Sequence, residues 1–122
     1  MNPVRMAKIE SGMRIVLDFN EAFNRHDVSK IAELLRDDCI FETTNPAPDG
    51  SSYKGKGAIT EYLQGFFHRS PQAHMEIEEI FGMGLHCILR WKYTWGDGHV
   101  RGVDIFKIEE GLISEKLSYV KG

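Results

Sequence analysis

The fold of this chain is decided by residues 89–108, which read LRWKYTWGDGHVRGVDIFKI. Two runs rich in β-branched and aromatic residues flank Asp97-Gly98, a dipeptide typical of a two-residue β-hairpin turn. With that turn, Trp91 is expected opposite Asp104. Because side chains alternate between the two faces of a strand, one face of the hairpin then carries eight residues. These are Leu89, Trp91, Tyr93, Trp95, Val100, Gly102, Asp104 and Phe106.

Asp104 is therefore a lone carboxylate on an apolar face, and two interpretations of it remain open. Burial disfavours the charged form of a carboxyl group, so Asp104 could be an acid/base group that exchanges protons near neutral pH. It could instead be a structural carboxylate, neutralised by a cation or a hydrogen-bond donor.

Composition narrows the class of protein. The 122 residues, with a net charge of −3, suit a single domain covering residues 1–122. Scattered basic residues predict no binding to nucleic acid, and no apolar run is long enough to predict a membrane span. Cys39 and Cys87 could form a disulfide, but without a secretory leader we expect two reduced thiols and a cytoplasmic location. The histidines show no metal-ligand spacing, so no metal is expected.

Hydrophobic periodicity predicts helices first and a meander of strands afterwards, in the order α-α-β-α-β-β-β-β. This order indicates an α+β fold in which three helices pack on a strongly curved, mostly antiparallel sheet. Such a cone can enclose a small, mostly apolar ligand. The expected helices are residues 8–25, 27–36 and 56–68, and the expected strands are 39–44, 74–81, 85–95, 99–108 and 112–120.

The sequence does not decide which residues of the last strand point inward, because this depends on the length of the turn at residues 109–111. A three-residue loop places Lys116 opposite Asp104, with Ser114, Ser118 and Val120 on the same face. A two-residue turn instead points Ile113, Leu117 and Tyr119 inward, as the hydrophobic pattern favours. In the first case Lys116 is either a charge partner of Asp104 or a member of a proton relay.

Three stretches resemble the SnoaL-like polyketide cyclase and ketosteroid isomerase branch of the nuclear transport factor 2-like superfamily. They are residues 19–41, 53–59 and 102–116, the last of which is similar to the "G-x-D-x-F-R-x-x-x-G-K-I-x-E" ending of that branch. The resemblance implies a cone-shaped, cystatin-like fold, no cofactor, and a pocket role for Asp104 as acid/base or hydrogen-bond donor. It also implies a homodimer through the outer sheet face, involving Arg90, Lys92, Val103 and Ile105.

The chain departs from the catalytic patterns of this superfamily at three positions. Thr43 stands where the isomerases have their general-base aspartate, and Phe19 stands where they have a hydrogen-bonding tyrosine. Ser118 replaces one aspartate of the related limonene-epoxide hydrolases. Threonine is no proton acceptor and phenylalanine has no hydroxyl, so neither steroid isomerisation nor epoxide hydrolysis is expected.

Two functions remain as hypotheses. One is a proton-transfer isomerase, cyclase or lyase for a small hydrophobic carbonyl compound, and the other is a non-catalytic binder of a small ligand. The expected catalytic residues are Asp104 and Lys116. The expected substrate-binding residues are Phe19, Trp91, Tyr93, Trp95, Phe106, Ser118 and Val120.

Overall fold

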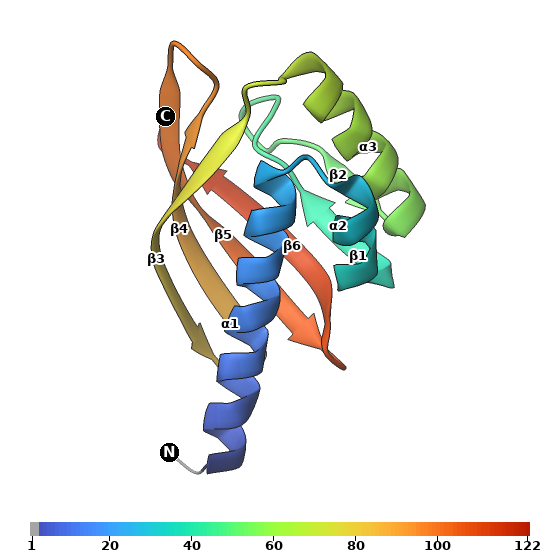
Figure 1. The fold of residues 1–122 in the computed structure, drawn as a ribbon, viewed down its shortest axis with the longest axis vertical. Coiled ribbons are helices and arrows are strands. Elements are labelled where there is room, and N and C mark those ends of the chain that lie inside the picture. The colour runs from blue at the N-terminus through green and yellow to red at the C-terminus, as the bar shows by residue number, and fades with distance from the viewer. Residues whose placement is uncertain (1–2) are drawn as a thin grey trace.

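A computed structural model describes residues 3–122 as three helices packed on one side of a curved, six-stranded sheet (Figure 1). The strand order is β2-β1-β6-β5-β4-β3, in which β1 and β6 are parallel and all other neighbours are antiparallel. This mixed α+β architecture confirms the predicted fold class. The elements are α1 (Pro3–Asn24), α2 (Val28–Leu34), β1 (Leu35–Glu42), β2 (Ser52–Lys54), α3 (Lys56–Arg69), β3 (His74–Met83), β4 (His86–Thr94), β5 (His99–Glu109) and β6 (Leu112–Val120).

Polar side chains fix the end of α1 and the start of α2. At the end of α1, the amide of Asn24 accepts from Met75 N at 2.7 Å and donates to Met75 O at 2.9 Å, which fastens the helix to β3. Asp27 caps α2 as predicted, since its carboxylate accepts from Lys30 N. The expected α2 was too long, because the chain turns straight into β1 at Leu35. Strand β2 was not predicted from the sequence.

The core lies between the helices and the inner face of the sheet. Its fully buried side chains come from every layer, with Val16 from α1, Ile59 from α3, and Phe41, Leu89 and Phe106 from the strands. The two cysteines, Cys39 and Cys87, are buried in it as free thiols. Within residues 3–122, no helix is long and apolar enough to cross a bilayer.

The β4–β5 hairpin is displaced by two residues from the predicted pairing. Thr94 pairs with His99, so the connection is the four residues 95–98, and Trp91 faces Gly102 rather than Asp104. The side chain of Trp95 folds over Gly98, where a Cβ would lie 2.6 Å from the indole ring. This packing requires a connection of four residues instead of the expected two. A slip of two residues keeps every side chain on its predicted face, so Asp104 still points inward.

The β5–β6 hairpin combines the two alternatives. Glu109 pairs with Leu112, so the turn is the two residues Glu110 and Gly111, both with positive φ. A β-bulge at Ser114 then adds one residue to β6, because Ile108 pairs with Ile113 but Lys107 pairs with Glu115.

That bulge decides what faces inward. Ile113 is buried before it, and beyond it the inward residues are Lys116, Ser118 and Val120. The expected pairing of Lys116 with Asp104 is wrong, since Ser118 faces Asp104 and Lys116 faces Phe106. Ser114 does not line the inner face, because its hydroxyl donates to Lys107 O at 3.2 Å.

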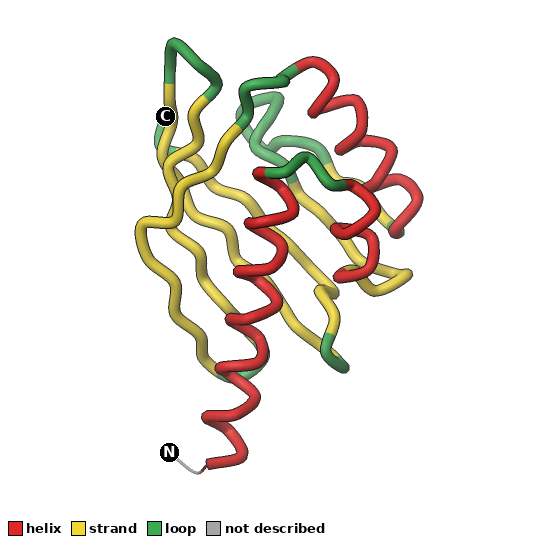
Figure 2. The backbone as a smooth tube through the Cα atoms, in the orientation of Figure 1, coloured by secondary structure: helices red, strands yellow, loops and turns green. Residues whose placement is uncertain are grey.

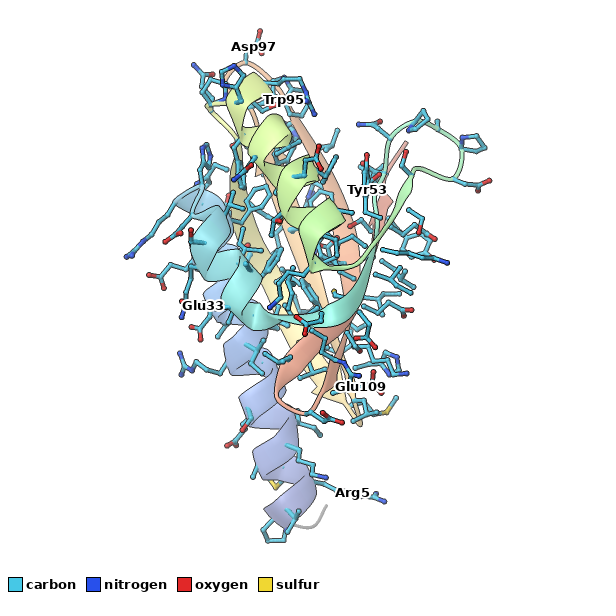
Figure 3. All side chains as sticks on the ribbon, turned by 90° about the vertical axis from the view of Figure 1, so that its right-hand side faces the viewer. Arg5, Glu33, Tyr53, Trp95, Asp97 and Glu109 are labelled. Carbon is cyan, nitrogen blue, oxygen red and sulfur yellow. The ribbon has the colours of Figure 1, made fainter. Side chains whose placement is uncertain are left out.

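Three loops gather at one end of the molecule (Figure 2). They are the β1–β2 loop, the α3–β3 loop and the β4–β5 loop, whose Trp95 and Asp97 lie at this end in Figure 3. Glu109, the last residue of β5, lies toward the opposite end.

Candidate functional site

A cavity of about 600 Å³ opens between the inner face of the sheet and helices α1 and α3. Its walls carry residues from α1, α3 and strands β1, β3, β4, β5 and β6, and its rim carries residues of the three gathered loops. The lining residues are Phe19, Phe23, Phe41, Thr43, Thr44, Asn45, Tyr62, Leu63, Phe66, Arg69, Ser70, Pro71, Gln72, Met75, Trp91, Tyr93, Trp95, Val100, Asp104, Lys116, Ser118, Val120 and Lys121.

Asp104 lies in the inner wall of this cavity and is 1% exposed. Neither of its carboxylate oxygens has a hydrogen-bond partner within the described residues. The nearest cation is Lys116, whose Nζ lies 3.8 Å from Oδ2, too far for a hydrogen bond. Asp104 is therefore a buried acid with unused hydrogen-bonding capacity.

Lys116 is held in place by two neighbours in the same wall. Its Nζ donates to Ser118 Oγ at 3.0 Å and lies 4.7 Å from the centre of the Phe41 ring, a cation–π contact. Its side chain is 14% exposed, so the ammonium is also partly removed from water. Asp104, Lys116 and Ser118 thus form one polar group in an otherwise apolar wall.

Trp91 adds a second unsatisfied group. Its indole crosses the sheet over Gly102, where a Cβ would lie 2.7 Å from the ring. The indole Nε1, which can only donate, is buried and has no partner in residues 3–122. Because buried polar groups are normally paired, an unpaired donor and an unpaired carboxylate in one cavity indicate a place for a polar ligand atom.

The cavity wall near the β4–β5 loop is aromatic. Tyr93 lies 5.6 Å from Trp95 and 6.1 Å from Phe66 between ring centres, which links β4 to α3. Burial raises the pKa of both Tyr62 and Tyr93, so these phenols stay neutral at physiological pH. Such rings suit a flat, apolar ligand body.

Of the residues expected to bind substrate, the structure brings all but one to the cavity: Phe19, Trp91, Tyr93, Trp95, Ser118 and Val120 line it, and Phe106 does not. Phe106 lies below the cavity in the core, with its ring 5.5 Å from that of Phe19. Phe106 is on the same face of β5 as Asp104 but two residues farther along the strand, where it pairs with Cys87 and is fully buried.

Thr43 has a structural place at the rim. Its hydroxyl accepts from Ser51 N at 3.1 Å and reaches the carbonyls of Asn45 at 3.1 Å and Ser51 at 3.3 Å. These bonds close the β1–β2 loop. Although Thr43 lines the cavity rim, all hydrogen bonds of its hydroxyl go to backbone atoms of the loop.

Arg69 and Lys121 also line the cavity, although neither was predicted from the sequence to belong to the site. Arg69 follows Tyr62 and Phe66 on one face of α3, a spacing that the sequence contains, but its position just before Ser70-Pro71 suggested an ordinary helix end. Within residues 3–122, no cluster of three His, Cys, Asp or Glu side chains could hold a metal ion.

Residues 16–116 match the family described as the SnoaL-like domain. The chain belongs to this family. An NTF2-like protein of unknown function from Mesorhizobium loti is 35% identical to it, with a TM-score of 0.84 over 94% of each chain. No curated protein matches this SnoaL-like chain.

Two more distant structures share the fold with this SnoaL-like chain. A protein from Kribbella flavida, provisionally described as a ketosteroid isomerase, is 16% identical with a TM-score of 0.81, covering 93% of this chain and 80% of its own. A protein from Sinorhizobium meliloti, provisionally described as a polyketide cyclase, is 19% identical with a TM-score of 0.76, covering 87% of this chain and 94% of its own. At these identities the likeness is one of fold alone.

Proposed function

We propose that this SnoaL-like chain is a proton-transfer enzyme that acts on a small, mostly apolar carbonyl compound. One observation carries the proposal. Asp104 is a buried carboxylate with no hydrogen-bond donor among residues 3–122, in the wall of a cavity large enough for a ligand and 3.8 Å from an ammonium group. A carboxylate that only stabilised the fold would be expected to have its hydrogen bonds satisfied.

The chemistry follows from the two charged groups. Asp104 takes a proton from the carbon next to the substrate carbonyl, and the C–H electron pair becomes part of an enolate. The enolate oxygen lies at Lys116 or at the indole N–H of Trp91, which stabilise its negative charge. Return of the proton to another carbon gives an isomerase. Attack of the enolate carbon on a second carbonyl, whose oxygen then takes the proton from Asp104, gives a cyclase. Loss of a β-leaving group, which takes that proton as it departs, gives a lyase.

Deuterium exchange tests the proposal without knowledge of the natural substrate. Aryl methyl ketones, cyclic enones and β-diketones that bind the cavity are incubated with the protein in deuterium oxide, and exchange next to the carbonyl is followed by NMR. Exchange with wild type should exceed that with Asp104→Asn by about a hundredfold. Asp97→Asn, in the exposed β4–β5 loop, is the matched control and should behave as wild type.

The same experiment decides between this function and a non-catalytic binder. If the protein only binds, both wild type and Asp104→Asn should bind these ketones, and neither should give exchange above that of buffer.

We further propose that the protein acts in the cytosol, because its two buried cysteines are free thiols.

A second proposal concerns the outer sheet face, which no helix covers (Figure 1). Four apolar side chains form a row there, paired strand to strand: Phe81 with Ile88, Ile88 with Ile105, and Ile105 with Leu117. Phe81 is 51% exposed. An apolar row of this kind on an uncovered sheet favours a homodimer through this face, which also contains Val103, Arg90 and Lys92.

The arginines beside the row are engaged in ion pairs on the same face. Arg101 pairs with Glu78 at 2.6 Å, and Arg90 pairs with Glu79 at 3.3 Å. Sedimentation should give a dimer for wild type and a monomer for Ile105→Lys, because the lysine charge would be buried in the interface. Ala58→Lys, on the exposed start of α3, should remain a dimer. A monomeric wild type would contradict the proposal.

A further inference from the structure

The cavity is more positive than the protein around it. Its lining contains three cations, Arg69, Lys116 and Lys121, and one acid, Asp104, whereas the whole chain carries −3. Lys116 and Asp104 lie 3.8 Å apart and offset each other at the inner end. The remaining cations of the lining are Arg69 and Lys121.

Arg69 is free to bind a ligand. Several arginines of this chain pair with carboxylates, such as Arg25 with Glu21 at 2.8 Å and Arg101 with Glu78 at 2.6 Å, but within residues 3–122 no carboxylate pairs with Arg69. Its guanidinium folds back along α3 over Gly65, where a Cβ would lie 2.9 Å from Nη1. A glycine inside a helix costs about 1 kcal/mol relative to alanine, and here it leaves room for the guanidinium beside the cavity.

Lys121 lies at the cavity from a different element, just beyond the end of β6. Its backbone N–H donates to Arg101 O at 2.9 Å, which holds this part of the chain against the sheet. Lys121 also borders a hollow on the outer sheet face together with Glu78, Arg90 and Arg101, so the positive charge at the outer end of the cavity is assigned to Arg69.

A ligand that matches the polar, aromatic and cationic parts of the cavity lining has three parts itself. Its inner end carries a carbonyl whose oxygen accepts from the unpaired indole N–H of Trp91 and whose neighbouring C–H faces the Asp104 carboxylate. Its body is apolar to match Phe66, Tyr93 and Trp95. Its outer end is an anion. A carboxylate fits the planar fork of an arginine well, and it would be repelled from the inner end by Asp104.

We infer that the natural ligand is an aromatic or alicyclic keto acid, with its ketone at Asp104 and Lys116 and its carboxylate at Arg69. The inference rests on the proposed function for the role of the ketone. It adds a charge requirement to the substrate class that the apolar wall by itself would not impose.

A simpler role for Arg69 must be separated from this one. Arg69 lies in the last turn of α3, where any cation is favoured by the helix dipole. That role affects the stability of the helix, but it does not distinguish a charged ligand from a neutral one. Selectivity between an acid and its ester is therefore the decisive measurement.

The probes are 6-acetyl-2-naphthoate and its methyl ester, which share a rigid aromatic body and a methyl ketone. Wild type should bind the acid about tenfold more tightly than the ester in fluorescence titrations. Arg69→Gln should weaken binding of the acid by about tenfold and leave the ester within about twofold. Arg14→Gln, an exposed arginine of α1 outside the cavity lining, is the control and should change neither.

The inference is overturned if wild type does not prefer the acid, or if Arg69→Gln weakens both probes equally. It is also overturned if Lys116→Met rather than Arg69→Gln abolishes the preference, since the carboxylate would then lie at the inner end. Failure of the proposed function looks different. In that case the acid binds with the expected dependence on Arg69, but its methyl ketone shows no exchange that depends on Asp104.

Discussion

Gly102 lies opposite Trp91 in the β4–β5 pairing, and the indole of Trp91 occupies the space in which a side chain at position 102 would begin. A Cβ there would be 2.7 Å from the ring and would also collide with the backbone oxygen of Tyr119 on β6. The missing side chain of Gly102 thus lets the indole lie flat in the cavity wall. Part of the shape of the cavity is set by a residue that does not line it.

Gly102→Ala should therefore destabilise the protein and disturb the cavity together. We expect a loss of about 1–3 kcal/mol in the free energy of unfolding, because both neighbours must move. Denaturant titration measures the loss, and tryptophan fluorescence reports the displaced indole. Gly57→Ala is the control, since nothing lies within 4 Å of a Cβ at that position in α3, and it should be neutral or stabilising. An unchanged unfolding midpoint for Gly102→Ala would contradict this account.

Thr43→Val tests whether Thr43 is a structural residue. The substitution removes the hydroxyl that accepts from Ser51 N and reaches the Asn45 carbonyl, so the free energy of unfolding should fall by about 1–3 kcal/mol. Thr44→Val is the matched control, because within residues 3–122 the Thr44 side chain makes no hydrogen bond, and it should lose less than half as much. Exchange catalysis by Asp104 should survive in Thr43→Val. Loss of catalysis with full stability would instead make Thr43 part of the chemistry.

Much of this architecture could be predicted from local patterns. The inward position of Asp104 followed from alternation alone, and it survived an error of two residues in the hairpin pairing because a slip of two preserves the face. The pairing itself could not be predicted, since it depends on how Trp95 packs over Gly98. Strand β2 was hidden because its pairing with β1 is specified by tertiary contacts rather than by its own short sequence.

The candidate site was harder to predict than the fold. Lys116 faces inward because of the bulge at Ser114, and the alternating pattern of β6 carries no mark of a bulge. Arg69 stood at the end of a helix, where a basic residue is ordinary, and its position in the cavity depends on how α3 packs. Residues whose role depends on the packing of separate elements are those that sequence patterns describe least well.

The buried thiols predict an alkaline weakening of the fold. Burial raises the pKa of Cys39 to about 12 and that of Cys87 to about 11, from a usual value of 9.0. Because the folded-state pKa values are raised, these thiols stabilise the fold fully below pH 9, and this stability is lost as the pH rises toward 11 and 12. Each thiol contributes a slope of at most about 1.4 kcal/mol per pH unit in that window.

The Cys39→Ala/Cys87→Ala variant isolates this contribution. Its stability should be lower near neutral pH, from the lost packing, but should fall less steeply above pH 9. Tyr62 and Tyr93, whose pKa values are also raised by burial, add to the decline from about 10.0 in both proteins. Equal slopes between pH 9 and 10 would mean that the thiols reach solvent in the folded state.

A double-mutant cycle measures the coupling of Asp104 and Lys116. Lys116→Met leaves a carboxylate that is 1% exposed without a cation, which should cost about 3 kcal/mol of stability. Adding Asp104→Asn removes that charge, so the double variant should return to within about 1 kcal/mol of wild type. The expected coupling energy is therefore at least about 2 kcal/mol, since any cost of Asp104→Asn alone adds to it.

The chain contains a matched pair for comparison. Lys107 and Glu109 also lie 3.8 Å apart, but their side chains are 36% and 35% exposed, against 14% and 2% for Lys116 and Asp104. Water screens the exposed pair, so the cycle of Lys107→Met and Glu109→Gln should give a coupling of about 0.5 kcal/mol. At equal separation of the charged atoms, the difference between the two cycles measures the effect of burial. Equal couplings would mean that water enters the cavity and screens Asp104, which would remove the physical basis for its proposed reactivity.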